Sequence, residues 1–266
     1  MSAFAESEGV YAELHDLHVG RLEMRDIRTA LAKGLADFSA IPSHYIVLAV
    51  IYPAIGALMF RAAAGADMFM MLFPIISGFA LVGPVAAIGL FEISRRREMG
   101  EDVSWRHVAS LLHAPGRRGI LVVALVLAIL YAAWLIAAHL IYEATLGKLA
   151  PDGMGAFAGL LFSTGEGWTL ILLGNAVGAG FALVAMVLSV FSLPMLLDGE
   201  HNPLRAMAIS VRACAANWPV MLSWGVVVAV IVAVACIPAF AGLAVALPVL
   251  AHATWHLYRR AIRHED

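Results

Sequence analysis

The sequence is short of charged residues and of cysteines. Asp, Glu, Lys and Arg make up only 14% of the 266 residues, whereas a soluble domain has about 25%. The two cysteines, Cys214 and Cys236, lie at opposite ends of one predicted helical segment. Their separation along a helix is about 33 Å, which excludes a disulfide between them. No paired cysteines with the spacing of zinc ligands are present.

Apolar residues are in excess instead. They account for 62% of the chain, and the mean hydropathy is +0.87. A soluble core needs only about 45–50%, so the excess indicates a surface that faces lipid. The net charge of −2 indicates no nucleic-acid partner. The first twenty residues are acidic and lack a basic start followed by an apolar run, so we expect no cleaved signal peptide.

Six apolar segments approach or exceed the roughly 20 residues that cross a bilayer as a helix. They cover residues 43–60, 68–93, 119–142, 169–197, 218–237 and 239–258. Pro42, Pro219 and Pro238 stand where these helices should begin or break. The sequence therefore predicts an all-α, polytopic membrane bundle with six transmembrane helices.

The basic residues are divided unequally between the two sides of this bundle. The N-terminal region, the loops after the second and fourth spans, and the C-terminal tail together contain fifteen Lys and Arg residues. The opposite side contains only Arg61 and Lys148. Positively charged loops stay in the cytoplasm, so we predict that both termini are cytoplasmic.

Three cytoplasmic segments have the pattern of amphipathic helices, namely residues 27–40, 104–112 and 203–216. In the first, the residues at helical spacing are apolar: Ile27, Ala30, Leu31, Leu35 and Phe38. The charged residues Arg28, Lys33 and Asp37 fall largely elsewhere. Such helices either lie in the membrane interface or pack on the bundle as cytoplasmic helices.

Each amphipathic segment precedes two spans, which predicts three like-oriented pairs of transmembrane helices. Short sequence echoes favour this repeat: Phe79-Ala-Leu-Val recurs at Phe181, and Pro84-Val-x-Ala recurs at Pro248. We predict a polar cytoplasmic segment over residues 1–26, one six-helix membrane domain over residues 27–260, and a cytoplasmic tail over residues 261–266.

Four ionisable residues are predicted at the cytoplasmic side of the bundle: Glu92, Asp198, His252 and His256. Two carboxylates and two imidazoles could bind a divalent metal or relay protons. Alternatively, the carboxylates pair with Arg95, Arg96 or Arg259, and the histidines anchor the helix. The zinc-protease pattern requires Glu after the first His, but Ala253 stands there. Zinc proteolysis is therefore not supported. The identity of any metal stays unassigned, and no cofactor is predicted.

Another motif lies in the fourth span. Gly174 and Gly178 have the GxxxG spacing that lets helices approach closely, and Asn175 could bond across helices. We interpret these three residues as a helix-packing site, with a pore as the alternative. His139 and His252 differ in predicted membrane depth by about 15 Å, which is too far to share one haem.

Four blocks of sequence resemble a known family: Ile76–Val85, Glu92–Arg97, Leu193–Asp198 and His252–Arg259. They are similar to the signature blocks of a bacterial integral-membrane family of unknown function. Some members are labelled as predicted integral membrane proteins and others as a cytochrome c oxidase subunit. The resemblance implies a location in the bacterial inner membrane and no established activity.

The first functional hypothesis is a non-catalytic accessory, assembly or scaffold subunit of a membrane complex, with a respiratory complex among the candidates. The alternatives are a transporter or channel for a small solute or ion, and a metal- or haem-handling membrane protein. The expected partners are the lipid bilayer and either a larger membrane complex or further copies of the chain. Enzymatic activity is not expected.

Overall fold

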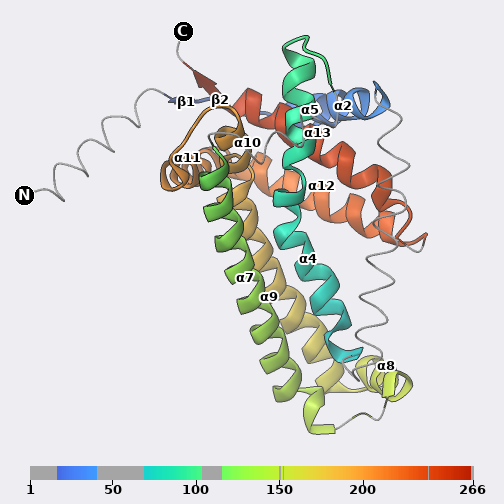
Figure 1. The fold of residues 1–266 in the computed structure, drawn as a ribbon. Helices are drawn as coiled ribbons and strands as arrows, with labels where there is room; N and C mark the ends of the chain where they lie inside the picture. Colours follow the sequence, from blue (N-terminus) through green and yellow to red (C-terminus); the bar gives the residue numbers. More distant parts are fainter. Residues whose placement is uncertain are drawn as a thin grey trace, which may run out of the picture. The chain divides into compact units, whose positions relative to one another are not determined.

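The computed structural model describes residues 17–40, 69–103, 116–149, 151, 153–238 and 240–264. The described residues form helices, apart from one two-stranded ribbon, so the predicted all-α class is confirmed (Figure 1). The predicted first span, residues 43–60, lies outside the described residues. The same holds for the predicted amphipathic segment over residues 104–112.

The chain divides into two compact units. The first unit is drawn from residues 1–49, 84–124 and 187–266. Its elements are β1 (Leu17–Val19), α2 (Met24–Ala40), α5 (Ile88–Glu98), α10 (Ser192–Leu197), α11 (Pro203–Ala216), α12 (Trp218–Cys236), α13 (Leu243–Ala261) and β2 (Ile262–His264).

The second unit is drawn from residues 50–83 and 125–186. It contains η1 (Phe69–Met71), η3 (Leu146–Leu149) and α8 (Gly153–Ser163). It also contains most of three longer helices, α4 (Leu72–Ala86), α7 (Arg117–Ala144) and α9 (Gly165–Ser189).

Three helical segments in the described part of the chain are long and apolar enough to cross a membrane. They are Arg117–Ala144, Gly165–Leu197 and Trp218–Cys236. These segments coincide with the predicted third, fourth and fifth spans. Pro219 lies in the first turn of α12, where its missing N–H has no helical partner to lose.

The residues of the predicted second span form two shorter helices with a break at Ala87, and neither is among the three membrane-crossing segments. α4 ends at Ala86 and α5 begins at Ile88. Pro84 in the last turn of α4 cannot donate a backbone hydrogen bond, and its ring crowds the preceding turn, which weakens the helix there. α5 then continues past the apolar segment into Arg95, Arg96 and Arg97.

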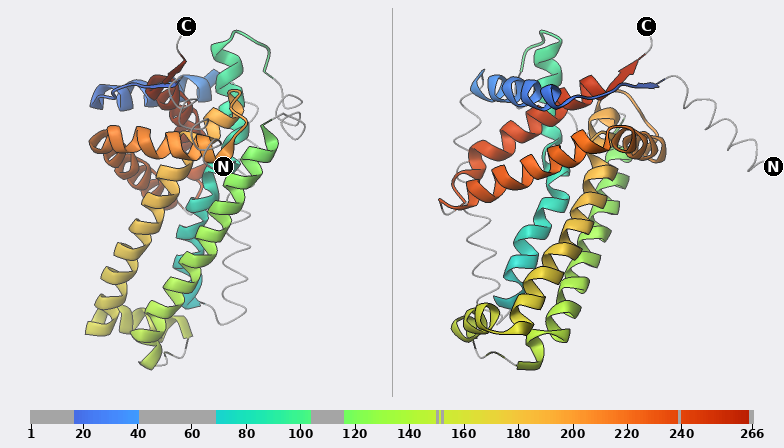
Figure 2. Two further views of the ribbon diagram at one scale, coloured as in Figure 1. Left: turned by 90° about the vertical axis from the view of Figure 1, so that its left-hand side faces the viewer. Right: turned by 180° about the vertical axis from the view of Figure 1, so that it is seen from behind.

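α2 packs across α13 in the first unit, as Figure 2 shows. The crossing depends on Gly34, because a Cβ atom there would lie 2.6 Å from the carbonyl oxygen of Val249 and 2.7 Å from the amide nitrogen of Ala253. The face of α2 that is turned inward comprises Asp26, Ile27, Ala30, Gly34 and Asp37. α2 is therefore packed against another helix along this face.

This inward face differs from the predicted one at two positions. Leu35, expected on the apolar side, is 52% exposed, whereas Asp37, expected on the polar side, is buried. The reason is that the buried residues follow the row 27, 30, 34, 37, and Leu35 points away from that row.

β1 and β2 pair as a short antiparallel ribbon, with Leu17 opposite His264 and Val19 opposite Ile262. The segment after β1 is held by Asn217, which lies between α11 and α12. Its Oδ1 accepts a hydrogen bond from the Leu22 amide at 2.7 Å, and its Nδ2 donates to the Gly20 carbonyl at 3.0 Å. Asn217 is buried, so these bonds satisfy its carboxamide in place of water.

Candidate functional site: polar clusters around α13

The carboxyl-terminal half of α13 places polar side chains against α2, α5 and α10. The contributing residues of α13 are His252, Trp255, His256, Tyr258 and Arg259. These five residues occupy two faces of the helix. Each hydrogen-bonds to a side chain on another segment, and together they form the two clusters described next.

The first cluster is centred on Asp37 of α2, and we call it the Asp37 cluster. Asp37 Oδ2 accepts hydrogen bonds from Ser94 Oγ at 2.5 Å and from His256 Nε2 at 2.8 Å. Asp37 Oδ1 accepts a hydrogen bond from Arg97 Nη1 at 2.7 Å. Ser94 Oγ also lies 2.8 Å from His252 Nδ1. The cluster therefore connects α2, α5 and α13.

The Asp37 carboxylate fixes the direction of every bond in its cluster. An ionised carboxylate only accepts hydrogen bonds, so Ser94 donates its hydroxyl proton to Asp37 and His256 donates its Nε2 proton. The Ser94 oxygen is then left as the acceptor for a proton on His252 Nδ1. These tautomers follow from the partners that surround each ring.

Burial makes the Asp37 cluster depend on its own bonds. Asp37, Ser94 and His252 are 7%, 0% and 3% exposed. Burial acts to raise the pKa of the Asp37 carboxyl, but the hydrogen bonds from His256 and Ser94 and the charges of the two histidines outweigh it. The pKa of Asp37 therefore lies below its usual value, and the carboxylate stays ionised in the folded protein.

The second cluster surrounds Asp198, the residue that follows α10. Asp198 Oδ2 accepts hydrogen bonds from Tyr258 Oη at 3.0 Å and from Arg259 Nη1 at 3.1 Å. Arg259 Nε also lies 3.3 Å from Glu98 Oε2, and Trp255 Nε1 donates to the same oxygen at 3.1 Å. The rings of Trp255 and Tyr258 pack with centroids 5.4 Å apart. This cluster connects α5, α10 and α13.

Glu92 belongs to neither cluster. It is 2% exposed and accepts hydrogen bonds from Arg95 Nε at 2.8 Å and from Arg96 Nε at 2.7 Å, all within α5. Hydrogen bonding to Glu92, opposed by burial, raises the pKa of the Arg95 guanidinium. Arg96 also pairs with Glu101 at 3.1 Å.

The four predicted site residues thus fall into three separate groups. His252 and His256 are in the Asp37 cluster, Asp198 binds Tyr258 and Arg259, and Glu92 binds Arg95 and Arg96. Within the described ranges, no group of three or more His, Cys, Asp or Glu residues could hold a metal ion. The residues that the sequence reasoning did not single out are Asp37, Ser94, Arg97, Glu98, Trp255 and Tyr258.

The three predicted packing residues of α9 lie in the second unit and have different surroundings. A Cβ atom on Gly178 would lie 3.0 Å from the Trp134 ring, so Gly178 is a packing position. Trp134 also packs against Phe181, with ring centroids 5.8 Å apart, and donates from Nε1 to the Pro74 carbonyl at 2.9 Å. Gly174 faces open space, and Asn175 is exposed.

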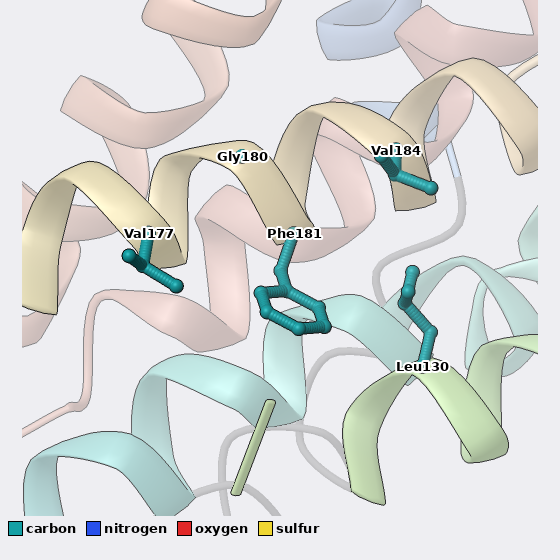
Figure 3. Close-up of a pocket in the computed structure, with 5 residues that line it drawn as sticks. All are labelled: Leu130, Val177, Gly180, Phe181 and Val184. Carbon is teal, nitrogen blue, oxygen red and sulfur yellow. The ribbon is translucent and has the colours of Figure 1, made fainter. Parts of the chain in front are cut away.

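A shallow apolar groove runs beside this packing site, between α7 and α9 (Figure 3). Its volume is about 290 Å³. It is lined by Leu130, Val177, Gly180, Phe181 and Val184. The lining has almost no polar surface, so the groove has no group that could orient a polar ligand.

Comparison with known protein families gives a match over part of the chain. Residues 72–198 match the model of a family described as "Predicted integral membrane protein (DUF2189)". Neither the curated proteins nor the solved structures give a match. The matched segment begins with α4 and ends at Asp198, so it includes Ser94, Arg97 and Glu98 but not their partners on α2 and α13. The resemblance to an integral-membrane family of unknown function is thereby confirmed over residues 72–198.

Proposed function

We propose that this protein is a non-catalytic accessory, assembly or scaffold subunit of a larger membrane complex. The observation that carries the proposal is how the polar groups around α13 are used. Asp37 accepts three hydrogen bonds and Asp198 accepts two, and each of these bonds comes from another segment of the same chain. The clusters hold α2, α5, α10 and α13 together.

A catalytic or transport site needs polar groups that reach a substrate. Here Ser94 and His252 are buried and face each other, and Tyr258, only 1% exposed, is directed at Asp198. Removing such groups from water costs free energy unless their hydrogen bonds are made internally. The internal bonds of these clusters favour a rigid structural unit made of α2, α5, α10 and α13, which we call the platform.

We also propose the complete six-span arrangement, with both termini in the cytoplasm of a bacterium and the helices inserted in its inner membrane. The division of Lys and Arg residues between loops supports this orientation. On this topology, both polar clusters lie at the cytoplasmic side of the bundle, and the platform faces cytoplasmic or membrane-embedded partners.

Purification in native lipid tests the accessory role. The full-length chain, extracted in polymer-bounded lipid discs, is expected to elute with a discrete set of other membrane proteins that mass spectrometry identifies. Respiratory subunits in that set would define the complex. Elution of this protein without other subunits, under conditions that keep a known membrane complex intact, would overturn the proposal.

Asp37→Asn tests in the same purification whether the Asp37 cluster is needed, and Asp102→Asn is its matched control. If the Asp37 cluster maintains the platform, this variant should lose the co-purifying proteins while the wild type retains them. Asp102→Asn removes an exposed carboxylate of the same type and should retain them. Equal retention by all three proteins would show that the platform is not the binding surface.

A further inference from the structure

A row of exposed residues follows α9 at intervals that alternate between three and four. The row consists of Gly165, Trp168, Leu172, Asn175, Ala179 and Ala182, all exposed in the single chain. This alternation averages 3.5 residues, the period along which two helices pack as a left-handed pair. Every helix has several such rows, so the spacing alone selects none of them.

Asn175 distinguishes this row from the other outward rows of α9. Its Nδ2 donates to the Ile171 carbonyl of the same helix at 2.7 Å, and its Oδ1 accepts no hydrogen bond from any described residue. Asn175 lies ten residues into a segment that is long and apolar enough to cross a membrane, about 15 Å from the start of the helix. Lipid chains offer no partner there, so an unmatched carboxamide is costly.

We propose that a second copy of this chain packs along this row of α9, and that the two Asn175 carboxamides hydrogen-bond to each other. Copies inserted with the same topology present parallel α9 helices, and a twofold axis places each residue of the row opposite its equivalent. The carboxamide contains both a donor and an acceptor, so it complements itself. A single Asn in an apolar seam fixes the register of such a pair.

The neighbours of Asn175 suit this pairing. Ala179 and Ala182 are the next two residues of the row, and small side chains let two helix backbones approach closely. The packing of α9 within its own chain uses a different face, where Gly178 and Phe181 contact Trp134. The row is therefore not consumed by the packing of the second unit. The pairing does not depend on the accessory role proposed above.

Disulfide cross-linking in native membranes tests the pairing directly. The background is Cys236→Ser, and Cys214 stays because it is buried. Ala179→Cys is expected to give a dimer that contains only this chain, by mass spectrometry, when an oxidant is added. Val184→Cys, an exposed position that lines the groove beside α7, is the control and should remain monomeric.

Three cross-linking results would contradict the proposal. No dimer from Ala179→Cys, or equal dimer from both variants, would overturn the pairing. A cross-link from Ala179→Cys to a different protein would overturn the assignment of the partner as a second copy.

The role of Asn175 itself is tested by the dimer dissociation constant, measured in detergent by sedimentation equilibrium. Asn175→Leu is expected to raise the dissociation constant roughly tenfold, which corresponds to the free energy of one interhelical hydrogen bond between membrane peptides. Asn175→Gln retains the carboxamide and should stay near the wild type. Because Asn175 is exposed on the single chain, neither change disturbs the monomer. An unchanged dissociation constant for Asn175→Leu would show that Asn175 does not contribute to the interface.

Discussion

Asp37 and His256 are joined by a 2.8 Å hydrogen bond between Oδ2 and Nε2, although 219 residues separate them in the sequence. The bond connects α2 to α13 about one helical turn from their close crossing at Gly34. It lies among further bonds of the same carboxylate to Ser94 and Arg97. The stability of the first unit should therefore depend on this one acidic side chain.

Replacing Asp37 with Asn should destabilise the protein strongly. The change leaves the guanidinium of Arg97 without its carboxylate and disturbs three hydrogen bonds in a buried site. Arg97 is partly exposed, so the loss should be smaller than the roughly 3–5 kcal/mol that breaking a fully buried ion pair costs. Thermal unfolding in detergent should show this loss, whereas Asp102→Asn should leave the midpoint near that of the wild type. Equal midpoints for the two variants would show that the cluster is not a determinant of stability.

The same carboxylate predicts a dependence of stability on pH. The pKa of Asp37 is lowered in the folded protein, so its stabilising contribution is complete above the unfolded pKa of about 3.9. That contribution disappears as the pH falls through the lowered folded value. The difference in unfolding midpoint between the wild type and Asp37→Asn should be constant near neutral pH and shrink below about pH 4. A difference that persists at the lowest pH would contradict an ionised Asp37.

Gly34→Ala should separate α2 from α13. The added methyl would meet the backbone at Val249 and Ala253 at distances that no real Cβ atom adopts, so one helix must shift. Hydrogen exchange over residues 24–40 should become faster, even though Ala favours helix by about 1 kcal/mol relative to Gly. Gly159→Ala in α8 adds the same methyl where nothing lies within 4 Å. That control should leave exchange over residues 24–40 unchanged.

Cysteine labelling should reveal the proposed orientation. In a Cys236→Ser background, Lys148→Cys should react with an impermeant maleimide on intact spheroplasts, and Arg212→Cys should react only after permeabilisation. The native Cys214 should remain unlabelled, because burial raises the pKa of its thiol to about 12 and the thiolate is the reactive form. Labelling of Arg212→Cys on intact spheroplasts would show that the orientation is the opposite of the proposed one.

The apolar segments could be read from the sequence because length and hydropathy are local properties. The predicted third span, residues 119–142, lies inside α7, and the predicted fifth span, residues 218–237, exceeds α12 by one residue. The break at Ala87 was missed, since a helix that contains Pro84 can either kink or stop, and hydropathy does not distinguish the two.

The polar clusters could be predicted only in part. His252, His256, Asp198 and Glu92 stand out because ionisable groups are rare in apolar segments. Their partners depend on which helices touch, and α2 meets α13 across most of the chain length. Asp37 did leave a signal, since it continues the row of Ile27, Ala30 and Gly34 on the inward face of α2. A charged residue on an otherwise apolar row is a sign of a buried partner.

The distance between Asp37 and His256 along the chain also sets an order of events during synthesis. At about 5–20 residues per second, a ribosome makes α13 roughly 10–45 s after α2. Until α13 is made, Asp37 lacks its partner His256, Ser94 lacks its partner His252, and Gly34 has no helix packed against it. The first unit therefore completes its packing late, because α2 and α5 must wait until α13 has been made. A translation product that stops before α13 would retain the bonds of Asp37 to Ser94 and Arg97 but would lack the bond to His256 and the helix that covers Gly34.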